Sequence, residues 1–151
     1  MKSYESMESI EEFEKEVEST TEEIQESRRE LEKIEERLSQ LEDVIKRMSG
    51  DEEFESSLEK NRKEASKEKE EALNEKEKLR NKIQDMKSSV GNLLDSYSET
   101  KADLKSLEEL GENVDEAKSV LENREKRLAD VGNRLDGLEE LLDAKVTHFF
   151  T

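Results

Sequence analysis

The feature of this chain that most constrains its fold is an apolar stripe that recurs every seven residues in two separate stretches. A helix with this period keeps one narrow edge facing one direction, and another helix must cover that edge. The sequence therefore predicts long helices that pack on helices. The first stripe contains Ile10, Phe13, Val17, Ile24, Leu31, Ile34, Leu38, Leu41, Ile45 and Met48, and the second contains Val114, Ala117, Leu121, Leu128, Val131, Leu135, Leu138, Leu142 and Phe149.

The composition favours an elongated protein with a thin core. Charged residues make up 46% of the 151 residues and hydrophobic residues only 30%, which is far from an ordinary globular balance. A disordered chain could share this composition, but it would lack periodic apolar residues. Proline is absent, so no residue forbids a continuous helix. We predict an all-α fold, either an elongated coiled-coil helical hairpin or a three-helix rod.

Two glycines divide the chain into three predicted helices. Gly50 and Gly111 each follow a long apolar pattern and suit the left-handed position just past a helix end. Asp51 suits a new helix start, and Asn113 with Glu116 has the spacing of a capping box. The predicted helices cover about 7–48, 52–110 and 114–147 within one elongated unit, 1–151. Segment 88–92, which contains Gly91, is either a hinge or third turn, or part of a continuous or kinked helix, and the unbroken apolar spacing favours the helix.

The first predicted helix carries more apolar edge than the neighbouring helix can cover. In an antiparallel hairpin, residues 31–41 face residues 60–69, which are nearly all charged. An uncovered apolar stripe of this length is typical of an interface. We therefore predict that this helix binds another helical chain, and the predicted interface is Ile24, Leu31, Ile34, Leu38, Leu41 and Ile45. The alternative is a compact three-helix arrangement in which both other helices share the cover.

Polar residues interrupt both stripes. They are Thr20, Ser27, Arg124 and Lys145. Isolated polar groups in a helical seam commonly fix register or partner choice. They can equally mark places where the seam is open to water, and the sequence does not separate these interpretations.

The charge of the chain excludes several classes of partner. The net charge is −17, and ten Glu lie within residues 1–26. Such a surface repels phosphates and anionic lipids, so we expect neither nucleic acid nor membrane as a partner. The acidic run is either a solvated helix face or a docking patch for a basic partner. Without a signal peptide pattern or an apolar membrane span, the default localisation is cytoplasmic, and secretion without a cleaved signal stays open.

Residues with the chemistry of catalysis or metal binding are scarce. The chain has no cysteine, and its single histidine is His148. A zinc site or a nucleophile–base pair requires a second such residue. The many carboxylates would need a desolvated pocket to act in catalysis, which a thin rod does not provide. We therefore expect no enzyme activity, metal, cofactor or small-molecule ligand.

Two functional hypotheses follow. The first is a non-catalytic subunit of a protein assembly that acts through its apolar seam, as a homodimer or with a different helical chain. The alternative is a helper of protein export, namely a small acidic helical chaperone or a co-secreted partner of a larger bacterial effector or toxin. Both predict a helical partner, and the sequence does not identify it.

Overall fold

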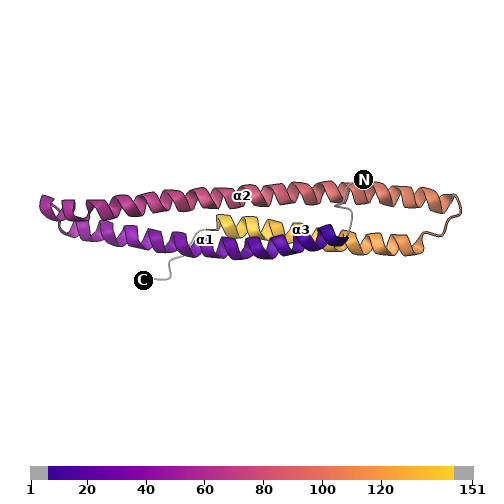
Figure 1. The fold of residues 1–151 in the computed structure, drawn as a ribbon, viewed down its shortest axis with the longest axis horizontal. Coiled ribbons are helices and arrows are strands. Elements are labelled where there is room, and N and C mark those ends of the chain that lie inside the picture. Colours follow the sequence, from indigo (N-terminus) through magenta and orange to yellow (C-terminus); the bar gives the residue numbers. More distant parts are fainter. Residues whose placement is uncertain (1–6, 145–151) are drawn as a thin grey trace.

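Three long helices form a rod in the computed structural model, which describes residues 7–144 (Figure 1). They are α1 (Met7–Arg47), α2 (Glu52–Glu109) and α3 (Asp115–Asp143). At 1.5 Å per residue, the 58 residues of α2 span about 87 Å. The described part of the chain contains no strand, so the predicted all-α class with long helices is confirmed.

The turn between α1 and α2 follows the sequence prediction. Gly50 has a φ of 94°, the left-handed conformation that favours glycine. Asp51 then caps α2, because its carboxylate accepts a hydrogen bond of 3.1 Å from the backbone N–H of Phe54. Glu52 and Glu53 follow in the first turn, where negative charge complements the helix dipole.

The turn between α2 and α3 also depends on a left-handed glycine. Gly111 has a φ of 92° and donates to the carbonyl of Glu108, while Glu112 donates to that of Leu107. This pair of bonds is a Schellman motif, which satisfies the last carbonyls of α2. The predicted capping box of Asn113 and Glu116 is wrong, because the N-cap of α3 is Val114 and has no side-chain capping hydrogen bond. The Asn113 side chain instead accepts a hydrogen bond of 3.2 Å from the backbone N–H of Asp115, just before the helix. The predicted end of this helix, near 147, lies outside the described residues.

α2 is a single continuous helix. It runs through 88–92 without a break, and Gly91 is helical, which confirms the favoured interpretation of this segment. α1 and α3 lie along different, overlapping parts of α2 (Figure 1). The overlap forms a three-helix section, and α2 continues beyond it in both directions with only one neighbour. We call these ends the α1–α2 arm (31–47 and 52–76) and the α2–α3 arm (100–109 and 115–121).

Ion pairs connect the three helices along the three-helix section. Arg127 of α3 lies 2.5 Å from Glu14 of α1, and Lys82 of α2 lies 3.3 Å from Glu16 of α1. Lys87 of α2 lies 2.8 Å from Asp136 of α3. The hydrogen bond to Asp136 raises the pKa of Lys87, so the Lys87 ammonium group remains charged at neutral pH.

Most of the core lies in the three-helix section. Its buried residues share the apolar positions of all three helices: Ile10, Val17, Ile24, Leu79, Ile83, Met86, Val90, Leu93, Tyr97, Leu121, Leu128, Val131, Leu135, Leu138 and Leu142. A second, much smaller cluster lies in the α1–α2 arm and consists of Leu31, Ile34 and Ala72, with Leu38 packed against it. The structure thus combines the two predicted architectures, a three-helix rod in the middle and helical hairpins at the ends.

The heptad pattern of α2 changes where α3 ends. One seam position of α2 is apolar from residue 58 to residue 93, with Leu58, Ala65, Ala72, Leu79, Met86 and Leu93, and its next member is Thr100. The other is charged in the α1–α2 arm, with Glu55, Arg62, Lys69 and Lys76, and apolar beyond it, with Ile83, Val90 and Tyr97 in the three-helix section and Leu104 in the α2–α3 arm. Ile83, Val90 and Tyr97 are buried in the core that α3 completes, whereas the four charged side chains are half-buried. Charge at this position therefore coincides with the absence of a third helix.

Two arginines from the other helices hold the end of α3. Arg28 of α1 donates to the carbonyl oxygens of Leu141 and Ala144, the latter at 2.9 Å. Arg80 of α2 forms an ion pair with Asp143. The last turn of α3 contains no basic residue of its own. Positive charge at this helix end, where carbonyl groups lack helical partners, is therefore supplied by its neighbours.

Thr20 is the one polar residue in the buried core of the described chain. Its side chain is 0% exposed, and its hydroxyl oxygen has no hydrogen-bond partner. This excludes the water-exposed interpretation for Thr20, whereas Ser27 and Arg124 are half-buried. Lys145 lies outside the described residues. An unpartnered buried hydroxyl lowers stability, which is a typical cost of a residue that specifies register.

We predict that Thr20→Val stabilises the fold by about 1 kcal/mol, because valine fills a similar volume without burying a hydroxyl. Urea unfolding followed by circular dichroism measures this change. Thr21→Val is the neighbouring control, since the hydroxyl of Thr21 donates to the carbonyl of Val17 and is only half-buried. A loss of stability in Thr20→Val would contradict the assignment.

Candidate functional site

The six residues predicted to contact another chain fall into two groups. Ile24 is buried in the three-helix core, and Leu31 and Ile34 are buried in the small cluster of the α1–α2 arm. These three therefore have cover within their own chain. The other three, Leu38, Leu41 and Ile45, are half-buried in the arm. The structure thus narrows the apolar edge available to a partner to the outer part of α1.

A groove follows α1 and α2 on the side opposite α3. On α2, the residues that bind α3 (Arg80 and Lys87) and those that line this groove (Glu68 and Glu75) lie on opposite sides of the helix. Residues seven apart continue the groove toward the end of the arm, so it keeps to one face. We call it the outer groove, lined by Glu23, Glu26, Glu30, Arg37, Leu41 and Val44 of α1 and by Leu58, Asn61, Glu68, Glu71 and Glu75 of α2.

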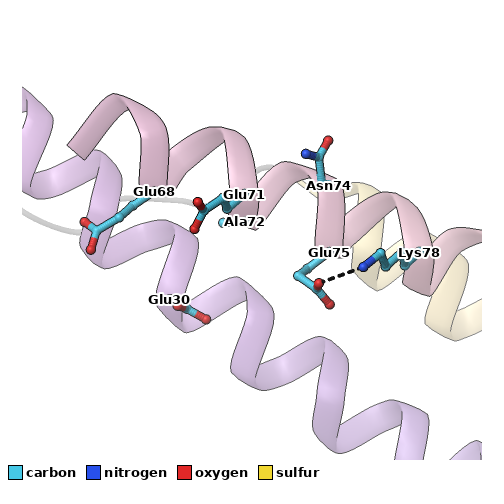
Figure 2. Close-up of a pocket in the computed structure, with 7 residues that line it drawn as sticks. All are labelled: Glu30, Glu68, Glu71, Ala72, Asn74, Glu75 and Lys78. Carbon is cyan, nitrogen blue, oxygen red and sulfur yellow. Dashed lines mark hydrogen bonds and ion pairs between the residues drawn. The ribbon is translucent and has the colours of Figure 1, made fainter. Parts of the chain in front are cut away.

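The inner part of the outer groove is acidic. One hollow of about 470 Å³ is lined by Glu30 on α1 and by Glu68, Glu71 and Glu75 on α2. Figure 2 shows these side chains around the hollow, with Ala72 between them and α3 behind the two helices. A second hollow of about 320 Å³ shares Glu30 and Glu75 and adds glutamates of α1. The two hollows form one acidic section, lined by Glu23, Glu26, Glu30, Glu68, Glu71 and Glu75.

The outer part of the groove is apolar. A hollow of about 410 Å³ is lined by Leu41 and Val44 of α1 and by Leu58 of α2. The ion pair between Arg37 and Glu68, at 2.5 Å, lies where this apolar section meets the acidic section. Val44 is 36% exposed, more than a valine in a covered seam would be. The groove therefore changes along its length from carboxylates to aliphatic side chains.

Half of the acidic side chains in the groove lack a cationic neighbour. Lys82 pairs with Glu23, Lys78 with Glu75, and Arg37 with Glu68. Within residues 7–144, Glu26, Glu30 and Glu71 form no ion pair. The acidic section therefore has an excess of negative charge that its own chain does not neutralise.

The opposite face of the α1–α2 arm has a different character. Arg62 occupies the charged seam position of α2 and forms an ion pair with Glu59, at 2.5 Å. The hydrogen bond from Arg62 lowers the pKa of the Glu59 carboxyl. Charges of Glu42 on α1 and Glu55 on α2 also act on Arg62. This face of the arm is thus polar, and a third helix would meet charged side chains there rather than apolar ones.

The α2–α3 arm also leaves apolar side chains open to solvent. Leu110 is 80% exposed at the turn, and Leu107 and Val120 are exposed nearby. A hollow of about 560 Å³ lies between Leu104, Ala117, Val120 and Leu121. It occupies the side on which α1 packs farther along the rod. Ala117 continues the predicted stripe but is exposed, because α1 begins beyond its reach.

The described residues offer little catalytic or metal-binding chemistry. Within 7–144, no group of three or more acidic, histidine or cysteine side chains is arranged to hold a metal ion. No described helix has the length and apolar character required to cross a membrane. His148 lies outside the described residues. The hollows of the described residues lie between neighbouring helices and are open to solvent.

Comparison of the chain with protein-family models, with curated proteins and with solved structures gives no match.

The sequence predicted Leu41 as an interface residue and did not include Val44, which lines the same hollow. Val44 lies beside the apolar stripe and does not belong to it. Its position is seven residues after Arg37 and fourteen after Glu30, which are both groove residues. This spacing would have predicted Val44 as a groove residue once the groove-facing side of α1 was known. The acidic section was missed because it combines glutamates from two helices that are about forty residues apart in sequence.

We predict that the double substitution Lys69→Leu and Lys76→Leu extends the apolar seam of α2 beyond the end of α3. Copies of the chain should then associate with one another. Two half-buried charged side chains would become aliphatic on a face that no helix covers. Light scattering should show an average mass that rises with protein concentration more steeply than in the unchanged protein.

The matched control is Lys63→Leu with Lys67→Leu, which removes the same charge from exposed positions outside the seam. Equal association of both double variants would show that the charged seam position of α2 has no special role.

Proposed function

We propose that this protein is a non-catalytic subunit of a protein assembly, and that it binds a helix of another chain along the α1–α2 arm. The observation that carries the proposal is the apolar hollow of the outer groove, lined by Leu41, Val44 and Leu58. Leu41 and Leu58 are half-buried and Val44 is exposed, on the face of α1 and α2 that lies opposite α3. The partner would lie in this groove and cover these side chains.

The free energy of apolar burial supports binding of a partner helix at this surface. Burial of apolar area contributes about 25 cal/mol per Å², and a helix laid in a groove buries such area through residues spaced three and four apart. Long two-helix coils with a small core are marginally stable alone. Among the described residues, the arm buries four apolar side chains, namely Leu31, Ile34, Ala65 and Ala72. A partner helix would add the packing that the arm lacks.

Site-specific crosslinking tests this proposal. The chain has no cysteine, so Val44→Cys provides a single attachment point for a photoreactive group. In the cells of origin, we expect a crosslinked product of discrete mass from this position. The control is Leu73→Cys, because Leu73 is on α2 in the same arm, is 43% exposed and lines none of the groove.

A second substitution makes the experiment specific. Leu41→Asp in the Val44→Cys chain places a charge in the apolar section and should lower the yield about tenfold, which corresponds to about 1.4 kcal/mol of binding. Circular dichroism confirms that the helices remain formed. The proposal is wrong if Val44→Cys and Leu73→Cys give the same products, or if Leu41→Asp leaves the yield unchanged.

A further inference from the structure

The proposed function does not specify the chemistry of the partner. The residues that line the outer groove indicate what that chemistry is. We propose that the occupant is a basic amphipathic helix, with aliphatic residues at one end and Lys or Arg along the remainder. This inference rests on the proposed function, because it concerns the same groove. It assigns the apolar section to the aliphatic end of the partner and the acidic section to its basic part.

The first argument is charge complementarity. Glu26, Glu30 and Glu71 line the acidic section without an ion pair in the described chain. They come from two facing helices, so a cation lying between α1 and α2 would meet carboxylates on both sides (Figure 2). A row of lysines or arginines along one face of a helix would approach these carboxylates at successive turns.

The second argument is length. From Glu23 to Val44 the outer groove covers 22 residues of α1, or about 32 Å. A helix of this length presents about six turns, enough for two aliphatic turns followed by four basic ones. Because the apolar section lies at one end only, such a helix binds in one orientation. The aliphatic end contributes affinity, and the basic part selects the partner.

The same charges disfavour a second copy of this chain in the groove. The protein has a net charge of −17, and glutamates outnumber the basic residues along the acidic section. A second copy laid along the whole groove would place glutamates against glutamates, which is destabilising. Nucleic acid is disfavoured for the same reason.

The test uses a synthetic helical peptide of about 21 residues, with leucines spaced three and four apart over the first two turns and lysines over the rest. Its twin carries glutamate in place of every lysine. Each peptide is labelled with a fluorophore and titrated with the full chain, and anisotropy reports binding. We expect the basic peptide to bind and the acidic twin to bind at least tenfold more weakly.

Variants then locate the contact. Glu26→Gln, Glu30→Gln and Glu71→Gln together should weaken binding of the basic peptide about tenfold, because exposed ion pairs contribute modestly and add up. The control combines Glu99→Gln, Glu109→Gln and Glu112→Gln, which removes the same charge from exposed positions outside the groove. This control should bind as the unchanged protein does.

The outcomes separate the two proposals. Equal affinity of the two triple variants, or equal binding of the two peptides, overturns the basic occupant. If Val44→Asp still weakens binding in that case, the apolar groove remains the site and the proposed function stands. If Val44→Asp also leaves peptide binding unchanged, the outer groove does not bind helical peptides, and both proposals are wrong. Absence of any binding by the basic peptide overturns this inference alone, since crosslinking at Val44→Cys tests the function separately.

Discussion

The stagger of α1 and α3 along α2 is the constraint on which the other features of this molecule depend. α2 has two seam positions, and only where both are apolar can it pack against two helices at once. That condition holds from Leu79 to Tyr97 and fails from Glu55 to Lys76. The three-helix core, the position of the end of α3 and the open α1–α2 arm all follow from this change. Arg28 and Arg80 then hold the end of α3 at the boundary.

The three-helix section provides most of the stability, whereas the α1–α2 arm is the part proposed to bind a partner. Nearly all fully buried large side chains lie in the three-helix section, from Ile10 and Val17 on α1 to Leu142 on α3. The α1–α2 arm has a small cluster and many exposed charges, so it contributes less to the free energy of unfolding. A region of low local stability with an uncovered apolar seam can adapt to a partner without disturbing the remainder of the fold. The proposed helix-binding role uses this difference between the two parts.

Much of the fold could be predicted from the sequence because its signals are local. Gly50 and Gly111 end helices through a backbone conformation that glycine adopts readily, and Asp51 caps α2 through its own side chain. The site was predicted less well, because it depends on how distant segments align. Ile24 was assigned to an interface, yet α2 and α3 bury it, and the position of α3 beside α1 is a tertiary property. The charged residues Arg62, Lys69 and Lys76 at one seam position of α2 indicate where no third helix packs. This is apparent only when the two seam positions of α2 are read separately.

Hydrogen–deuterium exchange, read at peptide resolution, tests the central claim most directly. The claim is that three helices pack together in the middle of the rod and only two in the α1–α2 arm. Amides of 83–97 and 128–142 should then exchange at least about tenfold more slowly than those of 34–45 and 58–72, because fewer buried contacts oppose local opening in the arm. Equal protection of both regions, or stronger protection of the arm in the isolated monomer, would contradict this account of the structure.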